Sequence, residues 1–372
     1  MQRQVVVPLD GSRLAEKALP HAVALARATG SGLTLLQAVS IPQVTNSLAG
    51  GDPVGSTVAA PREELLASAH TYLRDVTLRL GNEGLAFQQE VLAGDAAEAI
   101  IVYAEQHREV AMIVMSTRGR SGLTRWVLGS VAEKVLQVAP VLLAVIRPQG
   151  DSENQVDVDA SAFGRRGLPG IPTYRTILVP LDGSVLAEEA LPSALALAAP
   201  TGASLLLVSV LPLPHDVDLP PHPPATPAGD PSDDAATLLL HPRQSVAKAF
   251  QELAEREREA LTYYLASVAR RVAEAGTRGI EVRTRILDGD AATEILRASG
   301  EGGADLIVMS TRGHSGLARL WLGSVAMNVV RDSALPVLLV REQVAHHLEQ
   351  REQPEEQGDQ SSQSDGLAST QR

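Results

Sequence analysis

The sequence predicts two repeated α/β domains of the doubly wound, Rossmann-like class, each with a five-stranded parallel sheet and helices on both faces. Three observations lead to this prediction. The chain has 372 residues, more than a single hydrophobic core usually organises. Short apolar runs alternate with helical patterns, which is the order typical of a parallel sheet. The same succession then occurs twice, so that Asp10-Gly11-Ser12 is answered by Asp182-Gly183-Ser184.

The first domain is predicted over residues 1–147. Its strands are indicated by short apolar or alternating runs at residues 5–9, 33–39, 86–92, 111–115 and 140–146. Its helices are indicated by apolar residues at helical spacing over residues 14–29, over 63–80, after Gly94-Asp95 and over 130–138. Ser12 is expected to cap the first helix and Gly30 to end it. The Gly- and Pro-containing stretch at 41–61 is expected to form a loop.

The second domain is predicted over residues 174–342, after a flexible linker at residues 148–173. It repeats the programme of the first domain but carries a proline-rich insertion at residues 211–242. Because proline cannot join regular ladders, this insertion is expected to be polyproline-like or disordered. A long charged amphipathic helix is expected over residues 246–275. The polar tail at residues 343–372 is expected to be disordered.

Composition excludes several classes of function. The formal net charge is −12, which argues against a nucleic-acid backbone or an anionic membrane as partner. Only 3% of residues are aromatic, too few to suggest stacking platforms for single strands. The absence of cysteine excludes disulfides and thiolate metal sites. No signal peptide and no apolar run of about eighteen residues is found, so a cytoplasmic protein is expected.

The most distinctive repeat is a glycine loop between a strand and a helix. It runs from Met115-Ser116-Thr117-Arg118-Gly119 to Leu128-Gly129-Ser130, and again from Met309-Ser310-Thr311-Arg312-Gly313 to Leu322-Gly323-Ser324. Backbone N–H groups at a helix N-terminus have no internal partners and carry partial positive charge, so they receive an anion well. A strand, a glycine loop and a hydroxyl at a helix start therefore indicate two phosphate-binding pockets.

The aspartate of each Asp-Gly-Ser turn is expected to face the same pocket. In a doubly wound sheet, ligands lie beyond the carboxyl ends of the strands, where the strand order reverses. If the first and fourth strands are neighbours, Asp10 and the glycine loop face one crevice. Asp10 would then accept hydrogen bonds from ribose hydroxyls or an adenine amine, and Gly119 would let the backbone approach phosphate. The alternative interpretation is a tight turn with a helix cap and an ordinary loop glycine.

These motifs resemble those of the universal stress protein family, and each half of the chain resembles one family domain over nearly its full length. The opening Val-Pro-Leu-Asp-Gly-Ser, the later Gly-Asp-Ala-Ala and the glycine loop carry the resemblance. In the ATP-binding branch the loop reads Gly-x2-Gly-x9-Gly-Ser/Thr, whereas Ser116 and Ser310 replace its first glycine here. If that position requires a positive φ or bare backbone against phosphate, the serines weaken binding. If it does not, their hydroxyls add a contact.

The resemblance implies that each half binds ATP or a related adenine nucleotide, together with Mg²⁺. The first pocket would be lined by Pro8, Asp10, Val39, Met115, Gly119, Gly129, Ser130 and Val131. The second pocket would be lined by Pro180, Asp182, Val210, Met309, Gly313, Gly323, Ser324 and Val325. The backbone near Ala38-Val39 and Ser209-Val210 would meet the adenine.

No catalytic residue is predicted. The phosphate loops carry no fixed lysine and no candidate general base, so fast ATP hydrolysis is not expected. The sequence therefore indicates a nucleotide-binding stress-response protein that acts through its conformation or through an unknown protein partner. Two alternatives stay open. One is an adaptor that has lost nucleotide binding, and the other is a slow ATPase or an autophosphorylating protein with Ser130 or Ser324 as acceptor.

The last strand of each domain predicts how the two domains meet. Residues 141–146 and 337–340 are apolar and uncharged, so either strand would be an aggregation hazard if it lay at an exposed sheet edge. Pairing the two edges within one chain removes both hazards and makes the molecule a pseudo-dimer. The family resemblance points the same way, because family domains commonly dimerise through this strand. It is also compatible with a homodimer of the whole chain.

Overall fold

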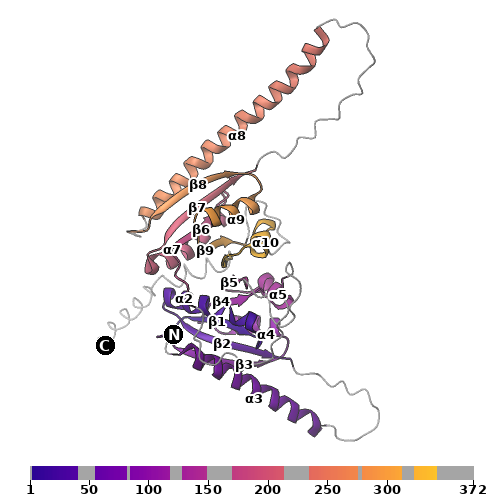
Figure 1. Ribbon diagram of the computed structural model, residues 1–372, viewed down its shortest axis with the longest axis vertical. Helices are drawn as coiled ribbons and strands as arrows, with labels where there is room; N and C mark the ends of the chain where they lie inside the picture. The colour runs from indigo at the N-terminus through magenta and orange to yellow at the C-terminus, as the bar shows by residue number, and fades with distance from the viewer. Residues whose placement is uncertain are drawn as a thin grey trace, which may run out of the picture.

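The computed structural model describes residues 2–40, 55–81, 84–117, 128–148, 170–212, 234–274, 279–311 and 322–341, with the side chains of 55–61 and 234–250 left out. Its strands form one ten-stranded sheet in the order β3-β2-β1-β4-β5-β10-β9-β6-β7-β8 (Figure 1). Each half supplies five neighbouring strands, and the pairs within a half are parallel. The predicted fold class, two repeated doubly wound domains, is confirmed.

The first half supplies one side of this sheet. Its elements are β1 (Gln4–Leu9), α1 (Arg13–Glu16), α2 (Leu19–Thr29), β2 (Gly32–Val39), α3 (Gly55–Leu80), β3 (Phe87–Ala93), α4 (Ala96–Gln106), β4 (Val110–Ser116), α5 (Ser130–Val138) and β5 (Leu142–Ile146). The order of these strands reverses between β1 and β4, which are hydrogen-bonded neighbours. The condition for a shared crevice is therefore met.

The second half repeats this order on the other side of the sheet. Its elements are β6 (Thr176–Pro180), α6 (Val185–Glu188), α7 (Ala190–Thr201), β7 (Ser204–Leu211), α8 (Asp234–Glu274), β8 (Val282–Asp288), α9 (Ala291–Glu301), β9 (Leu306–Ser310), α10 (Ser324–Asp332) and β10 (Val337–Val340). Its reversal lies between β6 and β9.

Two apolar cores cover the two faces of the sheet. Strand side chains alternate between faces, so Val5 and Val7 belong to one core while Val6 belongs to the other. Helices α2, α3, α7 and α8 contribute to the first core, and α4, α5, α9 and α10 contribute to the second. Burial on both faces explains why the strands read as continuous apolar runs.

The start of the predicted first helix is confirmed, but its continuity is not. Ser12 caps α1 by accepting a hydrogen bond from the Ala15 N–H at 3.1 Å, and Gly30 ends α2 with a φ of 62°. The single helix expected over residues 14–29 is wrong, because a turn separates α1 from α2. Pro20 lies in the first turn of α2 and has no N–H to donate to the preceding turn, so α1 cannot continue through it.

Both long helices start earlier than the sequence predicts. The loop expected up to residue 61 gives way to α3 from Gly55, and the irregular structure expected up to residue 242 gives way to α8 from Asp234. Each added residue contributes a hydrogen bond once a helix has nucleated, and the run from Ala235 to Leu240 contains good helix formers. Most of the predicted linker and insertion, and the tail, lie outside the described residues.

The two halves meet through the strand pair that the sequence predicts. β5 and β10 are antiparallel, with Leu143 opposite Leu339 and Val145 opposite Val337. Two arginines extend the junction in a nearly reciprocal way. Arg147 donates to the Arg331 carbonyl near the end of α10 at 3.0 Å, and Arg341 donates to the Leu136 carbonyl near the end of α5. The expected pairing of the two sheet edges is therefore confirmed.

Helix α2 also meets the second half directly. The His21 ring nitrogen lies 3.0 Å from the Tyr174 hydroxyl, and the two rings stack with their centroids 6.3 Å apart. Burial lowers the pKa of His21 to about 4, so the imidazole is neutral at this junction.

Across the described ranges, no helix combines the length and the apolar character that crossing a bilayer requires.

Candidate functional site

A cavity of about 310 Å³ lies at the carboxyl ends of the second-half strands. Every residue predicted for the second pocket lines it, apart from Gly313, which lies outside the described residues; these lining residues are Pro180, Asp182, Val210, Met309, Gly323, Ser324 and Val325. The strand-order reversal thus brings together residues that are more than 140 positions apart in the chain.

The cavity is lined by both aliphatic and oxygen-bearing residues. Val208, Val210 and Ile295 present aliphatic surface, whereas Asp182, Ser310 and Ser324 present oxygen atoms. A concave, mostly apolar site with a few convergent polar groups is the usual form of a small-molecule pocket. This set of residues suits a ligand that has one apolar part and one polar part.

The aspartate of each pocket is held by its own turn. The Asp182 carboxylate accepts hydrogen bonds from the Ser184 N–H at 3.0 Å and from the Ser184 hydroxyl at 2.6 Å. The Asp10 carboxylate accepts from the Ser12 N–H at 2.9 Å. Gly183 has a φ of 84°, which is unfavourable for other residues and explains the glycine. The tight turn and cap of the alternative interpretation are present, and Asp182 also lines the cavity.

Helices α5 and α10 start without a side-chain cap. Gly129 and Gly323 occupy the N-cap positions with extended backbone, at φ values of −64° and −65°. The Gly323 N–H donates to the Thr311 carbonyl at 2.8 Å, and the Gly129 N–H donates to the Thr117 carbonyl at 2.9 Å. Since glycine offers no side-chain acceptor, the first-turn N–H groups of these helices can receive an anion.

The serines that depart from the family loop lie in regular strands. Ser116 ends β4 and Ser310 ends β9, and both residues are buried. Extended backbone needs no glycine, so the serines impose no backbone strain at this position. Ser310 lines the cavity. This position therefore needs no positive φ in this chain, and the alternative requirement for bare backbone against phosphate stays a prediction.

The first half places its predicted residues on the equivalent elements. Pro8 lies in β1, Asp10 follows it, Met115 lies in β4, and Gly129, Ser130 and Val131 lie at the start of α5. Gly119 lies outside the described residues.

The strand register shows that Val39 does not occupy the position in β2 that corresponds to Val210 in β7. Pro8 pairs with Leu36 and Pro180 pairs with Val208, so Ala38 is the counterpart of the cavity-lining Val210. Val39 is the counterpart of Leu211 and faces the opposite side of the sheet. Of the predicted pair Ala38-Val39, Ala38 is therefore the counterpart of the cavity-lining residue.

Sequence reasoning missed the residues that α6 and α9 bring to the cavity. Ala187 of α6, together with Ala291 and Ile295 of α9, lines it. The repeated Gly-Asp-Ala-Ala motif contains Ala291, so the repeat itself was the available signal. Asp290 caps α9 by accepting from the Thr293 N–H at 2.9 Å, which fixes the helix start beside the cavity.

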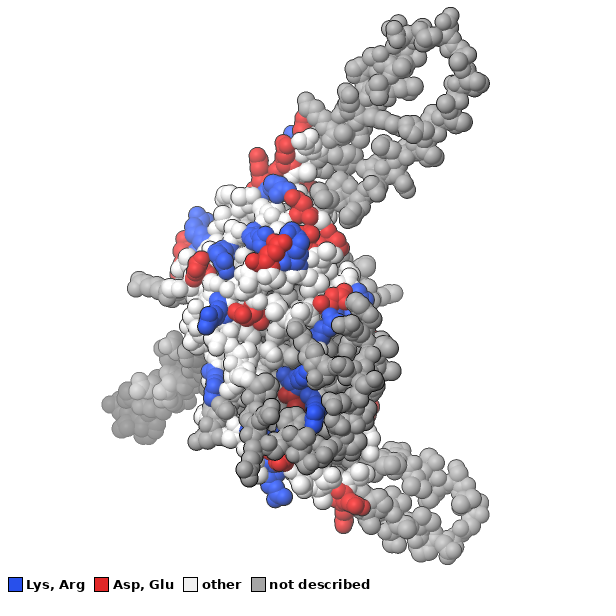
Figure 2. Space-filling view, in the orientation of Figure 1, with Lys and Arg blue, Asp and Glu red and all other residues white. Residues whose placement is uncertain are grey.

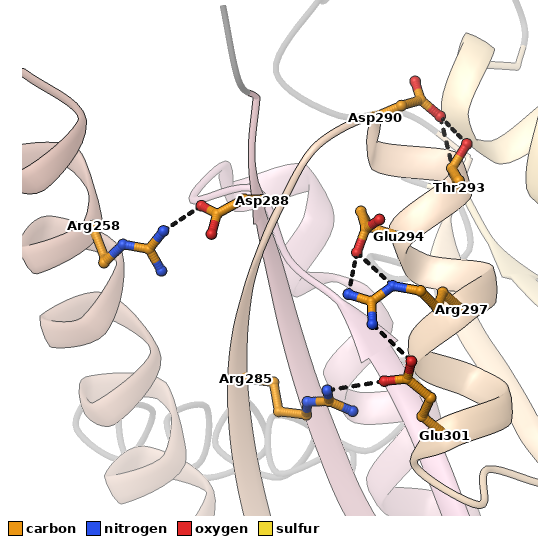
Figure 3. A network of polar contacts seen from close by, with 8 residues as sticks. All are labelled: Arg258, Arg285, Asp288, Asp290, Thr293, Glu294, Arg297 and Glu301. Carbon is orange, nitrogen blue, oxygen red and sulfur yellow. Dashed lines mark hydrogen bonds and ion pairs between the residues drawn. The ribbon is translucent and has the colours of Figure 1, made fainter. Parts of the chain in front are cut away.

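The outer face of α9 carries an ion-pair network (Figure 3). Arg297 donates to Glu294 at 2.9 Å and to Glu301 at 2.7 Å, and Arg285 of β8 reaches Glu301 at 3.2 Å. Figure 2 shows such positive and negative side chains interspersed on the visible face. The side chains of Arg285, Arg297 and Glu301 are 36% to 47% exposed, so this network lies at the solvated surface.

The corresponding helix of the first half has a different charge partner. Lys134 of α5 lies 3.2 Å from Asp95, the N-cap residue of α4. The hydrogen bond from the Glu98 N–H, and then Lys134, lower the pKa of Asp95.

Within the described part of the chain, no cluster of three or more acidic or histidine side chains is arranged to hold a metal ion.

Comparisons with known proteins cover both halves. A model of the universal stress protein family matches residues 1–147 and 173–341. A universal stress protein of Methanocaldococcus jannaschii is 31% identical over 168 residues, which are 45% of this chain and 82% of the relative. One from Mycolicibacterium smegmatis is 25% identical over 339 residues, 91% of this chain and 96% of the relative. A solved structure of a universal stress protein from Archaeoglobus fulgidus matches with a TM-score of 0.53 and 20% identity. The match covers 91% of this chain and 98% of the Archaeoglobus chain.

Proposed function

The chain belongs to the universal stress protein family, and from that premise we propose that it binds an adenine nucleotide, ATP or a relative, in one pocket per half. The observation that carries the proposal is the second-half cavity, which combines Asp182, an aliphatic wall and the uncapped start of α10. The protein acts as a stress-response regulator whose conformation or partner binding depends on the bound nucleotide.

Each part of the nucleotide has a chemically suitable surface in this pocket. The aliphatic side chains of Val208, Val210 and Ile295 receive the adenine ring. The Asp182 carboxylate accepts hydrogen bonds from ribose hydroxyls, which are stronger when the acceptor is charged. The N–H groups at the start of α10 and the Ser324 hydroxyl receive the phosphates. Mg²⁺ enters with the phosphates, because they supply the oxygen ligands that this ion prefers.

The proposal extends to the organisation of the whole chain. We take residues 1–147 and 174–342 as the two nucleotide-binding domains, joined by a linker at 148–173, with an insertion at 211–242 and a tail at 343–372. The proposed ligand is a cytoplasmic metabolite, so the protein is placed in the cytoplasm. The adaptor and the slow ATPase remain as rivals, and the serines no longer favour the adaptor on grounds of backbone strain.

The sequence offers a candidate fluorescent reporter for each proposed pocket. Its two tryptophans, Trp126 and Trp321, fall in the sequence of the two glycine loops. Trp126→Phe leaves Trp321 to report on the second pocket, and Trp321→Phe leaves Trp126 to report on the first. Titrating each single-tryptophan protein with ATP, ADP, AMP and cyclic AMP, with calorimetry in parallel, tests whether both pockets bind.

We expect Asp10→Ala to weaken only the first pocket and Asp182→Ala only the second. Losing hydrogen bonds to a charged acceptor costs about 1.5–3 kcal/mol, so the dissociation constant should rise by about tenfold or more. Asp332→Ala, at the far end of α10, is the matched control and should leave both pockets unchanged. ATP affinities that ignore the two aspartates would contradict the proposed pockets.

A further inference from the structure

A cluster of glutamate, tyrosine and arginine occurs in the same place in both halves, outside the predicted pockets. The first clamp consists of Glu16, Tyr72 and Arg79, and the second clamp consists of Glu188, Tyr264 and Arg271. In each clamp the glutamate ends the short helix after the Asp-Gly-Ser turn, and the other two residues lie on the long helix α3 or α8. The repeat persists although the second half carries the long insertion.

The first clamp is closed. Arg79 donates from its two terminal nitrogens to the two oxygens of Glu16, both at 2.9 Å, and the Tyr72 hydroxyl donates to Glu16 at 3.0 Å. Asp75 holds the Arg79 Nε at 3.0 Å. The Arg79 and Glu16 side chains are only 18% and 10% exposed. A two-pronged arginine–carboxylate pair that is so well shielded has a fixed geometry.

The second clamp is looser. Arg271 makes one contact to Glu188 at 2.7 Å, and its side chain is 56% exposed. Among the residues that the structure describes, the buried Tyr264 hydroxyl has no hydrogen-bond partner of ordinary geometry. Burial first, and then the nearby charge of Glu188, raise the pKa of its phenol. Ser267 stands where Asp75 stands in the first half, and in the part of the chain that the structure describes, no carboxylate other than that of Glu188 pairs with Arg271.

The glutamate of each clamp follows, in the chain, an alanine that is connected to the pocket. Glu16 follows Ala15, whose N–H binds Ser12, and the Ser12 N–H binds Asp10. In the second half Glu188 follows Ala187, which lines the cavity. Burial is the main cause that raises the pKa of Tyr72, and the charge of Asp10 adds to it, as the charge of Asp182 does for Tyr264. The tyrosines are therefore within electrostatic reach of the pocket aspartates.

We propose that the two clamps are positioning elements: Tyr72 with Arg79, and Tyr264 with Arg271, fix the short helices α1 and α6 and thereby orient Asp10 and Asp182 for the ligand. This proposal rests on the proposed nucleotide binding. The same contacts connect each pocket to a long helix, and α8 extends well beyond the sheet (Figure 1). The closed first clamp makes its pocket more dependent on the arginine than the loose second clamp does.

The test uses the single-tryptophan proteins. In the protein that keeps Trp126, Arg79→Gln should raise the ATP dissociation constant of the first pocket by about tenfold. In the protein that keeps Trp321, the same change should leave the second pocket within about twofold. Arg79→Lys keeps the charge but loses the two-pronged geometry, so it should restore part of the affinity. Arg271→Gln should weaken the second pocket by a smaller factor than Arg79→Gln weakens the first.

Controls separate positioning from stability. Arg74→Gln and Arg270→Gln remove exposed arginines on the same helices, at positions outside the clamps, and should change neither pocket. Tyr72→Phe removes one oxygen atom and serves if Arg79→Gln does not fold, with an expected loss of about threefold. Melting temperatures that fall in the clamp variants while both affinities stay at the parental value would overturn the proposal. A parental chain that binds no nucleotide would overturn the proposed function and the positioning role together.

Discussion

At the scale of single residues, some functional side chains can be predicted from the sequence and others cannot. The Asp-Gly-Ser turn and the Gly-Ser helix start were predictable because their residue types have few structural uses and recur at fixed spacing. Glu16 was not predictable, because its partners Tyr72 and Arg79 lie 56 and 63 positions away. A glutamate on a short helix looks like an ordinary surface residue until tertiary packing buries it.

His21 provides a residue-scale prediction about acid stability. Its pKa is about 4 in the folded chain and about 6.5 in an unfolded one, so the unfolded chain binds more protons between these values. Above pH 6.5 the imidazole is neutral in both states and the free energy of unfolding is not reduced by its titration. As the pH falls from 6.5 toward 4, the unfolded chain is protonated first, so the free energy of unfolding falls. We expect this loss to be on the order of 3 kcal/mol.

The measurement is the unfolding free energy of the parental chain and of His21→Gln across this pH range. The parental curve should fall more steeply toward acid than the curve of the variant, which has no imidazole at position 21. His70→Gln changes an exposed histidine on α3 and should follow the parental slope. Parallel curves for the parental chain and His21→Gln would show that His21 does not bind its proton differently in the two states.

At the scale of elements, the strands were predicted well and the helix limits less well. Strand runs such as Val5 to Leu9 are buried on both faces, so the hydrophobic pattern itself marks them. The start of α8 was predicted too late because the proline content was taken over the whole stretch 211–242. The last part of this stretch contains good helix formers and belongs to the helix. Helix propagation from the buried C-terminal part of α8 is a tertiary effect that composition does not reveal.

The uncapped starts of α5 and α10 yield an element-scale prediction. Gly323→Asp places a carboxylate at the N-cap of α10, where the backbone is already extended. The new side chain can satisfy first-turn N–H groups and should stabilise the helix by a few tenths of a kcal/mol. The same charge occupies the proposed phosphate site and repels phosphate, so ATP affinity in the second pocket should fall by about tenfold or more.

A melting curve and an ATP titration of the Trp126→Phe protein, with and without Gly323→Asp, provide the measurement. Gly129→Asp makes the same change in the first half, so it is the matched control for the second pocket and should leave that pocket unchanged. An affinity that survives Gly323→Asp would place the anion somewhere other than the start of α10.

At the scale of the whole molecule, the repeat becomes one continuous sheet. The apolar, uncharged last strands predicted that the halves would meet at β5 and β10, because unpaired edges of this kind promote aggregation. The arginines that extend the junction, and the His21–Tyr174 contact, could not be predicted from the sequence. Their positions depend on the mutual orientation of the halves, which no local pattern specifies.

The central claim is that one chain holds two adenine nucleotides, one in each half. Its most direct test is the nucleotide content of the purified chain, released by denaturation and measured by chromatography after saturation with ATP and removal of the excess. The account predicts two nucleotides per chain, falling to one with either Asp10→Ala or Asp182→Ala. A chain that carries none and ignores millimolar ATP would contradict it and would leave an adaptor without a nucleotide.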